Sequence, residues 1–89
     1  MFRVKLACKG VPENAGAEAA TDIQQEFSTH RTRYKSVVCA YVDGELLLTA
    51  ENDFDPKGVA LMDEFSDCVS AYVAELFDGQ IRVVEAIIV

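Results

Sequence analysis

The stretch from Asp55 to Gly79 constrains the fold most, because it carries the start, the apolar stripe and the end of one long helix. Asp55 is a suitable N-cap, since its carboxylate can accept hydrogen bonds from the free N–H groups of the first turn, and Pro56 fits the position after it. Phe54 and Val59 have the spacing of a hydrophobic staple, and Gly79 is a typical end residue. We therefore predict an amphipathic helix over this stretch. Its apolar residues recur at intervals of three and four: Leu61, Met62, Phe65, Cys68, Val69, Tyr72, Val73 and Leu76.

Apolar and polar residues alternate in much of the remaining chain, which is typical of half-buried strands. Asp43-Gly44 has the composition of a type I′ hairpin turn, which pairs Val42 with Glu45 on the flanking strands. The segment from Asn14 to about Ser28 has a narrow stripe of small residues and predicts a second helix. The predicted strands are 2–8, 34–42, 45–50 and 80–89.

The last predicted strand, 80–89, is rich in isoleucine and valine and has Glu85 near its middle. Because a carboxylate prefers water to an apolar core, we place Glu85 on the solvent side. Alternation then assigns the other residues to faces: Val84, Ala86 and Ile88 in the core, and Val83 and Ile87 outward.

The elements follow in the order β-α-β-β-α-β, which is two strand-helix-strand units joined by a hairpin. This order is typical of the ferredoxin-like sandwich, an α+β fold with a four-stranded antiparallel sheet in the order 4-1-3-2. Right-handed crossovers place both helices on one face of that sheet. We therefore predict a single two-layer domain over residues 1–89, with one sheet face left open.

The open sheet face is predicted to be too apolar for a freely solvated surface. Arg3 and Lys5 on the first strand are expected to pair with Glu45 or Glu51 on the neighbouring strand. A contiguous exposed apolar patch usually marks an association surface, so we predict a homodimer packed sheet to sheet. A monomer with scattered apolar residues is the alternative. The predicted dimer face consists of Val38, Ala40, Val42, Leu47, Val83 and Ile87.

The charge balance narrows the possible partners. The 89 residues include 15 acids and 8 bases, for a net charge of −7, and an acidic chain repels the phosphate backbone of nucleic acids. The sequence has no apolar run long enough to cross a bilayer and no secretory signal pattern. Three cysteines without close spacing favour free thiols in a reducing compartment. We expect a cytoplasmic protein that binds neither nucleic acid nor membrane.

Residues with the potential for chemistry are few, and the sequence has no specific catalytic or metal-binding motif. Lys9-Gly10 lies between the first strand and the first helix, where such folds can hold an anion at a helix N-terminus. Together with Arg31 and Arg33, these two residues are the candidate ligand-binding positions, although nearby acids disfavour anions. His30 is the only histidine, which excludes a multi-histidine metal site. We therefore assign no catalytic residue, metal or cofactor.

The three cysteines and the acidic run 51–55 have simpler explanations than a reactive site. Cys8, Cys39 and Cys68 fall on predicted core faces, so we interpret them as buried structural residues and not as nucleophiles. The acidic run resembles the first half of a calcium-binding loop, but a proline occupies the position where that loop requires glycine. We expect this run to pair with the basic run 31–35 at the same end of the sheet.

The hairpin from Val38 to Ala50 resembles that of acylphosphatases, small βαββαβ enzymes, with Asp-Gly at the turn. The resemblance covers about a dozen residues. The family's catalytic asparagine corresponds to Ala40 here, and no arginine follows a glycine-rich loop after the first strand. Because neither the attacking water nor a phosphoryl group is positioned, the resemblance implies shared architecture without shared chemistry.

These observations favour a non-catalytic, self-associating binding or regulatory module. One alternative is a small-molecule (effector) binding domain that resembles amino-acid-sensing ferredoxin-like domains, with its ligand at the Lys9-Gly10 loop or the dimer seam. A second alternative is a small enzyme whose site is shared between subunits. The fold does not separate these readings, because one fold hosts many functions.

Overall fold

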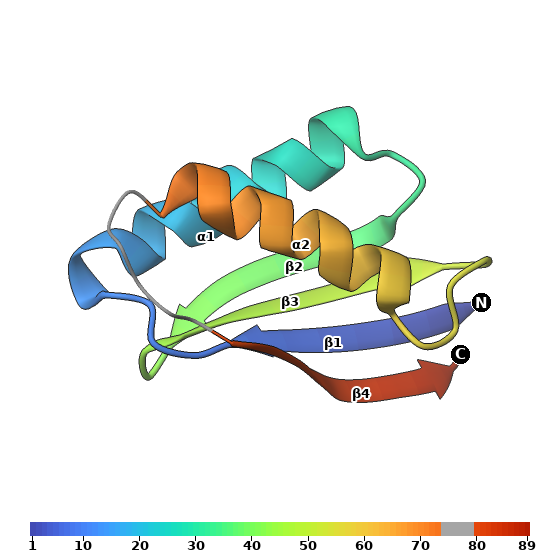
Figure 1. Cartoon of the computed structure of the whole chain (residues 1–89). Coiled ribbons are helices and arrows are strands. Elements are labelled where there is room, and N and C mark those ends of the chain that lie inside the picture. The colour runs from blue at the N-terminus through green and yellow to red at the C-terminus, as the bar shows by residue number, and fades with distance from the viewer. Residues whose placement is uncertain (74–79) are drawn as a thin grey trace.

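A four-stranded antiparallel sheet with two helices on one of its faces forms the protein (Figure 1). The computed structural model describes residues 1–73 and 80–89. The strand order is β2-β3-β1-β4, which confirms the predicted ferredoxin-like arrangement. The elements in chain order are β1 (Phe2–Cys8), α1 (Glu13–His30), β2 (Lys35–Val42), β3 (Glu45–Asn52), α2 (Val59–Tyr72) and β4 (Ile81–Ile88).

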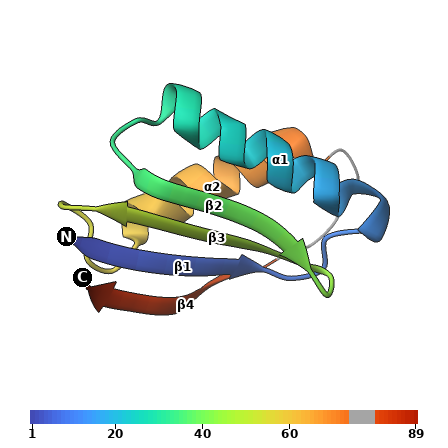
Figure 2. The ribbon, with the colours of Figure 1, turned by 180° about the vertical axis from the view of Figure 1, so that it is seen from behind.

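The core lies between the helix layer and the inner sheet face. Seen from behind, α1 lies over the β2 side of the sheet, with α2 next to it (Figure 2). The central strands β1 and β3 alternate as predicted, with every second side chain enclosed beneath the helices, except that Ala7 on the open-face side of β1 is also buried. The fully buried large side chains of the core include Val4, Leu6, Ile23, Phe27, Leu46, Leu48, Leu61 and Phe65.

The hairpin between β2 and β3 has the predicted turn and register. Asp43 and Gly44 both have positive φ, 51° and 80°, which is the conformation that a type I′ turn requires. Val42 pairs with Glu45, as expected from that turn. Near the start of β2 the pairing shifts by one residue, and Ser36 has a φ of 53° in this irregular stretch.

The helix α1 approaches β2 closely at Gly16. In a helix, alanine is normally more stable than glycine by about 1 kcal/mol. A Cβ atom at Gly16 would overlap the ring of Tyr41 on β2. The Tyr41 hydroxyl in turn donates a hydrogen bond to the carbonyl of Val11, at 2.8 Å. The small-residue stripe of α1 therefore fits the tyrosine ring as well as the sheet.

The helix α2 begins at Val59, three residues later than the predicted first residue Pro56. Asp55 still satisfies its first turn, because the carboxylate accepts hydrogen bonds from the backbone N–H groups of Val59 and Leu61 at 3.0 and 3.1 Å. Gly58, with a φ of 77°, precedes the helix and lies against Val4, where a side chain would clash. The predicted capping function of Asp55 is correct, whereas its position next to the helix is wrong.

Two other features predicted for this helix differ from the structure. Val59 is 65% exposed, which is not the burial of a hydrophobic staple, and Phe54 packs on Tyr34 with ring centroids 5.7 Å apart. The described helix ends at Tyr72, because Val73 adopts extended backbone angles. The predicted end at Gly79 lies outside the described residues.

The strand β4 departs from the predicted alternation, because one extra residue interrupts its pairing with β1. Lys5 lies opposite Glu85, but the following residue, Leu6, lies opposite Val83, so Val84 is left over in a β-bulge. Residues paired across a sheet point to the same side. Val83 therefore lies on the helix side with Leu6, and its predicted outward position is wrong.

Candidate interaction surface

The strand β4 is apolar but exposed along almost its whole length. Ile88 is 81% exposed and Val84 is 49% exposed, although both were predicted to lie in the core. Ala86, the third predicted core residue of this strand, is also exposed. The helices leave this strand uncovered, since only Ile81 among its eight residues is even partly buried. The burial prediction for β4 is therefore wrong.

The strand β4 also exposes the backbone groups along one of its edges. It pairs with β1 along one side and is the last strand of the sheet, so its other edge has no partner strand among the described residues. In Figure 1 it forms the lower border of the molecule, away from the helix layer. Only Arg82 and Glu85 carry charge on this strand. A long, apolar and unpaired edge strand is a recognised site of association between chains.

Two ion pairs cross the open sheet face, and they match the predicted pairing only in part. Arg3 pairs with Glu51 at 3.0 Å, one of the expected partners, whereas Glu45 pairs with Arg82 at 2.8 Å and not with a β1 residue. Ile87 lies opposite Arg3 and keeps its predicted place on this face.

The apolar part of this face lies mainly on the hairpin. Val38 is 56% exposed, and Val42 at the end of the same strand is also exposed. Ala40 and Leu47 pair with each other and are only partly accessible. The predicted dimer face is therefore divided, since Val83 lies on the helix side and Ile87 lies two strands away from the hairpin patch.

Arg31 and Arg33, two of the candidate ligand-binding residues, are both engaged by Glu64 of α2. Its two carboxylate oxygens accept hydrogen bonds from these guanidinium groups at 2.9 and 2.8 Å. The Arg33 guanidinium also lies over the rings of Tyr34 and Phe54, about 5 Å from each centroid. The expected partners in the acidic run 51–55 are thus replaced by a residue of α2.

The groups around Glu64 change the pKa of its carboxyl group. Burial alone raises the pKa of a carboxyl group, but at Glu64 the adjacent Tyr34 hydroxyl and the two guanidinium groups outweigh it and lower the pKa. Burial, together with the nearby Glu64 carboxylate, raises the pKa of the Tyr34 hydroxyl. Arg31 also lies 3.8 Å from Glu26 of α1, so two carboxylates offset the two guanidinium groups and connect both helices to the 31–34 loop.

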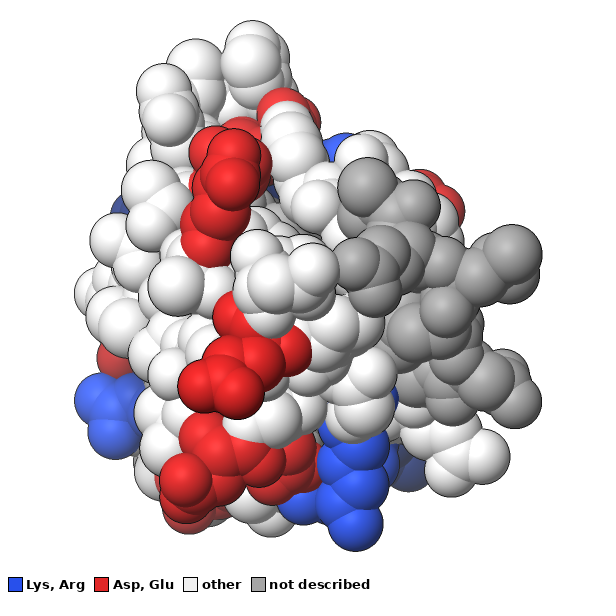
Figure 3. Space-filling model, turned by 90° about the vertical axis from the view of Figure 1, so that its left-hand side faces the viewer, with Lys and Arg blue, Asp and Glu red and all other residues white. Residues whose placement is uncertain are grey.

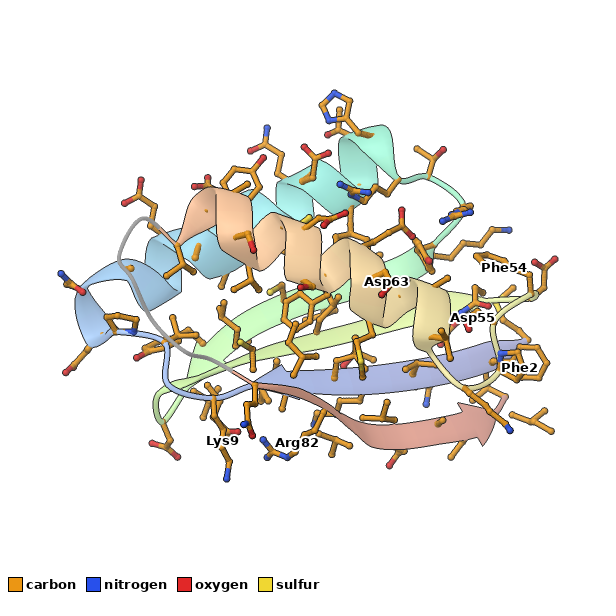
Figure 4. All side chains as sticks on the ribbon, in the orientation of Figure 1. Phe2, Lys9, Phe54, Asp55, Asp63 and Arg82 are labelled. Carbon is orange, nitrogen blue, oxygen red and sulfur yellow. The ribbon has the colours of Figure 1, made fainter. Side chains whose placement is uncertain are left out.

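The other candidate ligand-binding residues, Lys9 and Gly10, lie at the opposite end of the sheet. Lys9 is labelled beside Arg82 in Figure 4, whereas Phe54 and Asp55 are at the far end. The Lys9-Gly10 loop borders a shallow hollow of about 450 Å³ whose lining also includes Asp43 and Glu45. Viewed from this end, the surface carries a row of acidic side chains (Figure 3). The structure therefore does not bring the four predicted ligand-binding residues together, and the carboxylates disfavour an anion.

The three cysteines are buried and unpaired, as predicted. Burial is the main cause that raises the pKa of each thiol, and it raises the pKa of Cys39 to about 12. A thiol with a raised pKa is a poor nucleophile. Within residues 1–73 and 80–89, no cluster of three histidine, cysteine or acidic side chains has a geometry that could hold a metal ion.

The exposure of the helix-side residues of β4 was not predicted from the sequence. The available signal was the absence of strict alternation: Val83-Val84 and Ala86-Ile87-Ile88 are apolar without a break. Such a run is apolar on both faces, which is typical of a strand that needs cover on both sides. The position of Glu85 alone was not enough to assign those faces.

Comparison with known proteins found no matching family model, no matching curated protein and no matching solved structure. Across the described part of the chain, no helix has the length and apolar character needed to cross a membrane.

Proposed function

We propose that this protein is a non-catalytic, self-associating binding module, and that β4 forms the centre of the interface between two copies. The observation that carries the proposal is the exposure of an apolar strand on both faces and along one edge. We place the protein in the cytoplasm, because its three thiols are free.

The energetics favour a covered β4. Burying one valine or isoleucine side chain completely contributes about 1.5–3 kcal/mol. The C-terminal segment exposes Val83, Val84, Ile87, Ile88 and Val89. Contributions from two copies, even when each side chain is buried only in part, are of the same size as the association cost of about 4–15 kcal/mol.

A second copy is favoured as the partner because small chains have few residues with which to build a core. A domain of this size buries well under three-quarters of its unfolded surface, so association adds a substantial share of the total burial. The net charge of −7 does not prevent it, since the charges of β4 itself, Arg82 and Glu85, are of opposite sign.

The test compares two aspartate variants by sedimentation equilibrium. Ile88→Asp places a charge in the proposed interface and should shift the monomer–dimer equilibrium toward monomer by at least about tenfold. Val38→Asp is the matched control, because Val38 is an exposed valine on the far edge strand β2. A wild type that is already monomeric contradicts the proposal, and so does a dimer that only Val38→Asp dissociates, which would favour the open hairpin face.

The effector-binding alternative has less support from the geometry. Arg31 and Arg33 are held by Glu64, and Lys9 lies at the other end of the sheet beside carboxylates. A shared-site enzyme would need a group with an activated nucleophile or base, and the buried thiols do not provide one.

A further inference from the structure

The hydrogen bonds at the two ends of β4 establish which of its backbone groups face outward. The Val89 N–H donates to the Met1 carbonyl at 2.9 Å, and the Lys9 N–H donates to the Gln80 carbonyl at 3.2 Å. In an antiparallel ladder, hydrogen-bonded and non-hydrogen-bonded pairs alternate. Counting inward from both ends, four residues of β4 therefore turn their N–H and C=O groups away from β1, to the free edge of the sheet: Ile81, Val83, Ala86 and Ile88.

The same four residues all point their side chains to the helix side. They lie opposite the β1 residues Cys8, Leu6, Val4 and Phe2, respectively. In a regular strand, Val83 and Ala86 would face opposite ways, because they are three positions apart. The extra residue Val84 in the bulge places Val83 and Ala86 on the same face. The free edge of β4 therefore carries outward backbone groups together with a row of apolar side chains.

We propose that the free edge of β4 pairs antiparallel with β4 of a second copy, around a two-fold axis between Val84 and Glu85. This inference rests on the self-association proposed above and specifies its geometry. Val83 then lies opposite Ala86 of the second copy, and Ile81 lies opposite Ile88 of the second copy. The two sheets join into one of eight strands, with all helices on the same side.

The bulge selects this axis among the symmetric arrangements. If the two-fold axis passed through a residue before the bulge, only the outward backbone groups of Ile81 and Val83 could form hydrogen bonds with the second copy. An axis through a residue after the bulge would allow this only for Ala86 and Ile88. The axis between Val84 and Glu85 is the one that uses all four residues, because each half of the strand then meets the other half.

The charges of β4 agree with this register. An axis through Arg82 would set two arginines directly opposite each other, which is destabilising. In the proposed register, Arg82 lies diagonal to Glu85 of the second copy, a separation that a long side chain spans. Both residues are on the open face, since they lie opposite Ala7 and Lys5 of β1. The strand is therefore self-complementary in charge as well as in apolar surface.

Ala86 provides a sharp test, because its N–H faces the edge and not β1. Ala86→Pro removes that donor, and proline is tolerated on an edge strand where the N–H faces solvent. Ala86→Val is the matched control, with similar size and the N–H retained. The dimer dissociation constant should rise by about tenfold or more in the proline variant, because the two-fold removes one hydrogen bond from each copy. The valine variant should stay close to wild type.

Hydrogen exchange of the wild-type amides gives a second test that needs no variant. The N–H groups of Ile81, Val83, Ala86 and Ile88 should be protected at concentrations where the dimer forms and should exchange quickly on dilution. A protein that is monomeric at every concentration overturns both the proposed function and this inference. A dimer that leaves these four amides unprotected and survives Ala86→Pro overturns the edge pairing only, and self-association stands.

Charge reversal tests the register itself. Arg82→Glu and Glu85→Arg should each weaken the dimer, because each places like charges on the diagonal. Mixing the two variants should restore association, since every diagonal then joins opposite charges. Equal association of the mixture and of the separate variants would contradict the proposed axis.

Discussion

At the scale of single residues, Glu64 connects α2 to the loop between α1 and β2. Its carboxylate on α2 accepts hydrogen bonds from Arg31 and Arg33, which follow α1 and precede β2. Arg31 also approaches Glu26 of α1, at 3.8 Å. The pKa of Glu64 is lowered because the charged carboxylate, and not the neutral acid, fits between two guanidinium groups.

The first prediction concerns the pH dependence of this cluster. A depressed folded-state pKa means that the stabilisation is complete above the unfolded-state value of about 4.3 and is lost as the pH falls through the folded-state value. Glu64→Gln should therefore lower the free energy of unfolding by about 1 kcal/mol near pH 7. Urea denaturation at a series of pH values should show the difference between the two proteins shrinking below about pH 4. A difference that stays constant down to pH 2 would contradict the assignment.

Gly16 gives the second prediction, because its environment opposes its helix propensity. Alanine favours helix by about 1 kcal/mol over glycine, yet a methyl group here would overlap the Tyr41 ring. Gly16→Ala should therefore destabilise the protein by about 1–3 kcal/mol in urea denaturation. In a Tyr41→Ala background the same substitution should become neutral or stabilising. Equal effects in both backgrounds would show that the ring contact is not the cause.

At the scale of elements, the start of α2 depends on a residue that lies outside the helix. Asp55 is buried and satisfies two N–H groups of the first turn. The side-chain oxygen Oδ1 of Asn52 accepts hydrogen bonds from the N–H groups of Phe54 and Asp55 in the preceding turn. The cap type was predictable from local sequence. The exact start was not, because it depends on Gly58 fitting against Val4 of a strand more than fifty residues earlier.

The third prediction tests this cap. Asp55→Ala removes both acceptors and should lower the free energy of unfolding by about 1–2 kcal/mol. Asp55→Asn keeps one acceptor oxygen in the same place and should cost less. Denaturation curves of the three proteins at one concentration provide the measurement. An alanine variant as stable as the wild type would mean that water satisfies these N–H groups equally well.

The fourth prediction concerns the bulge in β4. Deleting one residue from a strand normally sends the side chains beyond it to the other face. Deleting Val84 should instead preserve the register of both halves of β4 with β1, because Val84 is the unpaired residue. The deletion should therefore leave a folded protein with a native-like NMR spectrum. Deleting Lys5 from β1 is the control and should abolish folding, since it moves core residues to the open face. An unfolded Val84 deletion would contradict the register.

At the scale of the whole molecule, the architecture was predictable and the interaction surface was only partly so. Periodicity and the Asp43-Gly44 turn are local signals, and together they determine the order of elements and the sheet topology. The faces of β4 depend on how that strand lies against β1, which no local pattern records. The extra residue at Val84 reverses the alternation there, so the predicted dimer face included Val83 and excluded Ile88.

The consequence for function is a shift of the proposed contact from the open face to the edge of the sheet. On the open face, the charged side chains of Arg3 and Arg82 already have partners within the same chain, Glu51 and Glu45. The β4 edge has no such internal compensation, since its outward backbone groups and apolar side chains lack partners within the described chain. A dimer through this edge leaves the hairpin residues Val38 and Val42 accessible.

The most direct test of the central claim is the mass of the wild-type protein in solution across a range of concentrations. Sedimentation equilibrium from low to high micromolar protein should show the mass rising from the 9.8 kDa of one chain to twice that value. The rise should disappear in Ile88→Asp and persist in Val38→Asp. A mass of one chain at every concentration would contradict the claim that the exposed strand β4 is an interface between two copies.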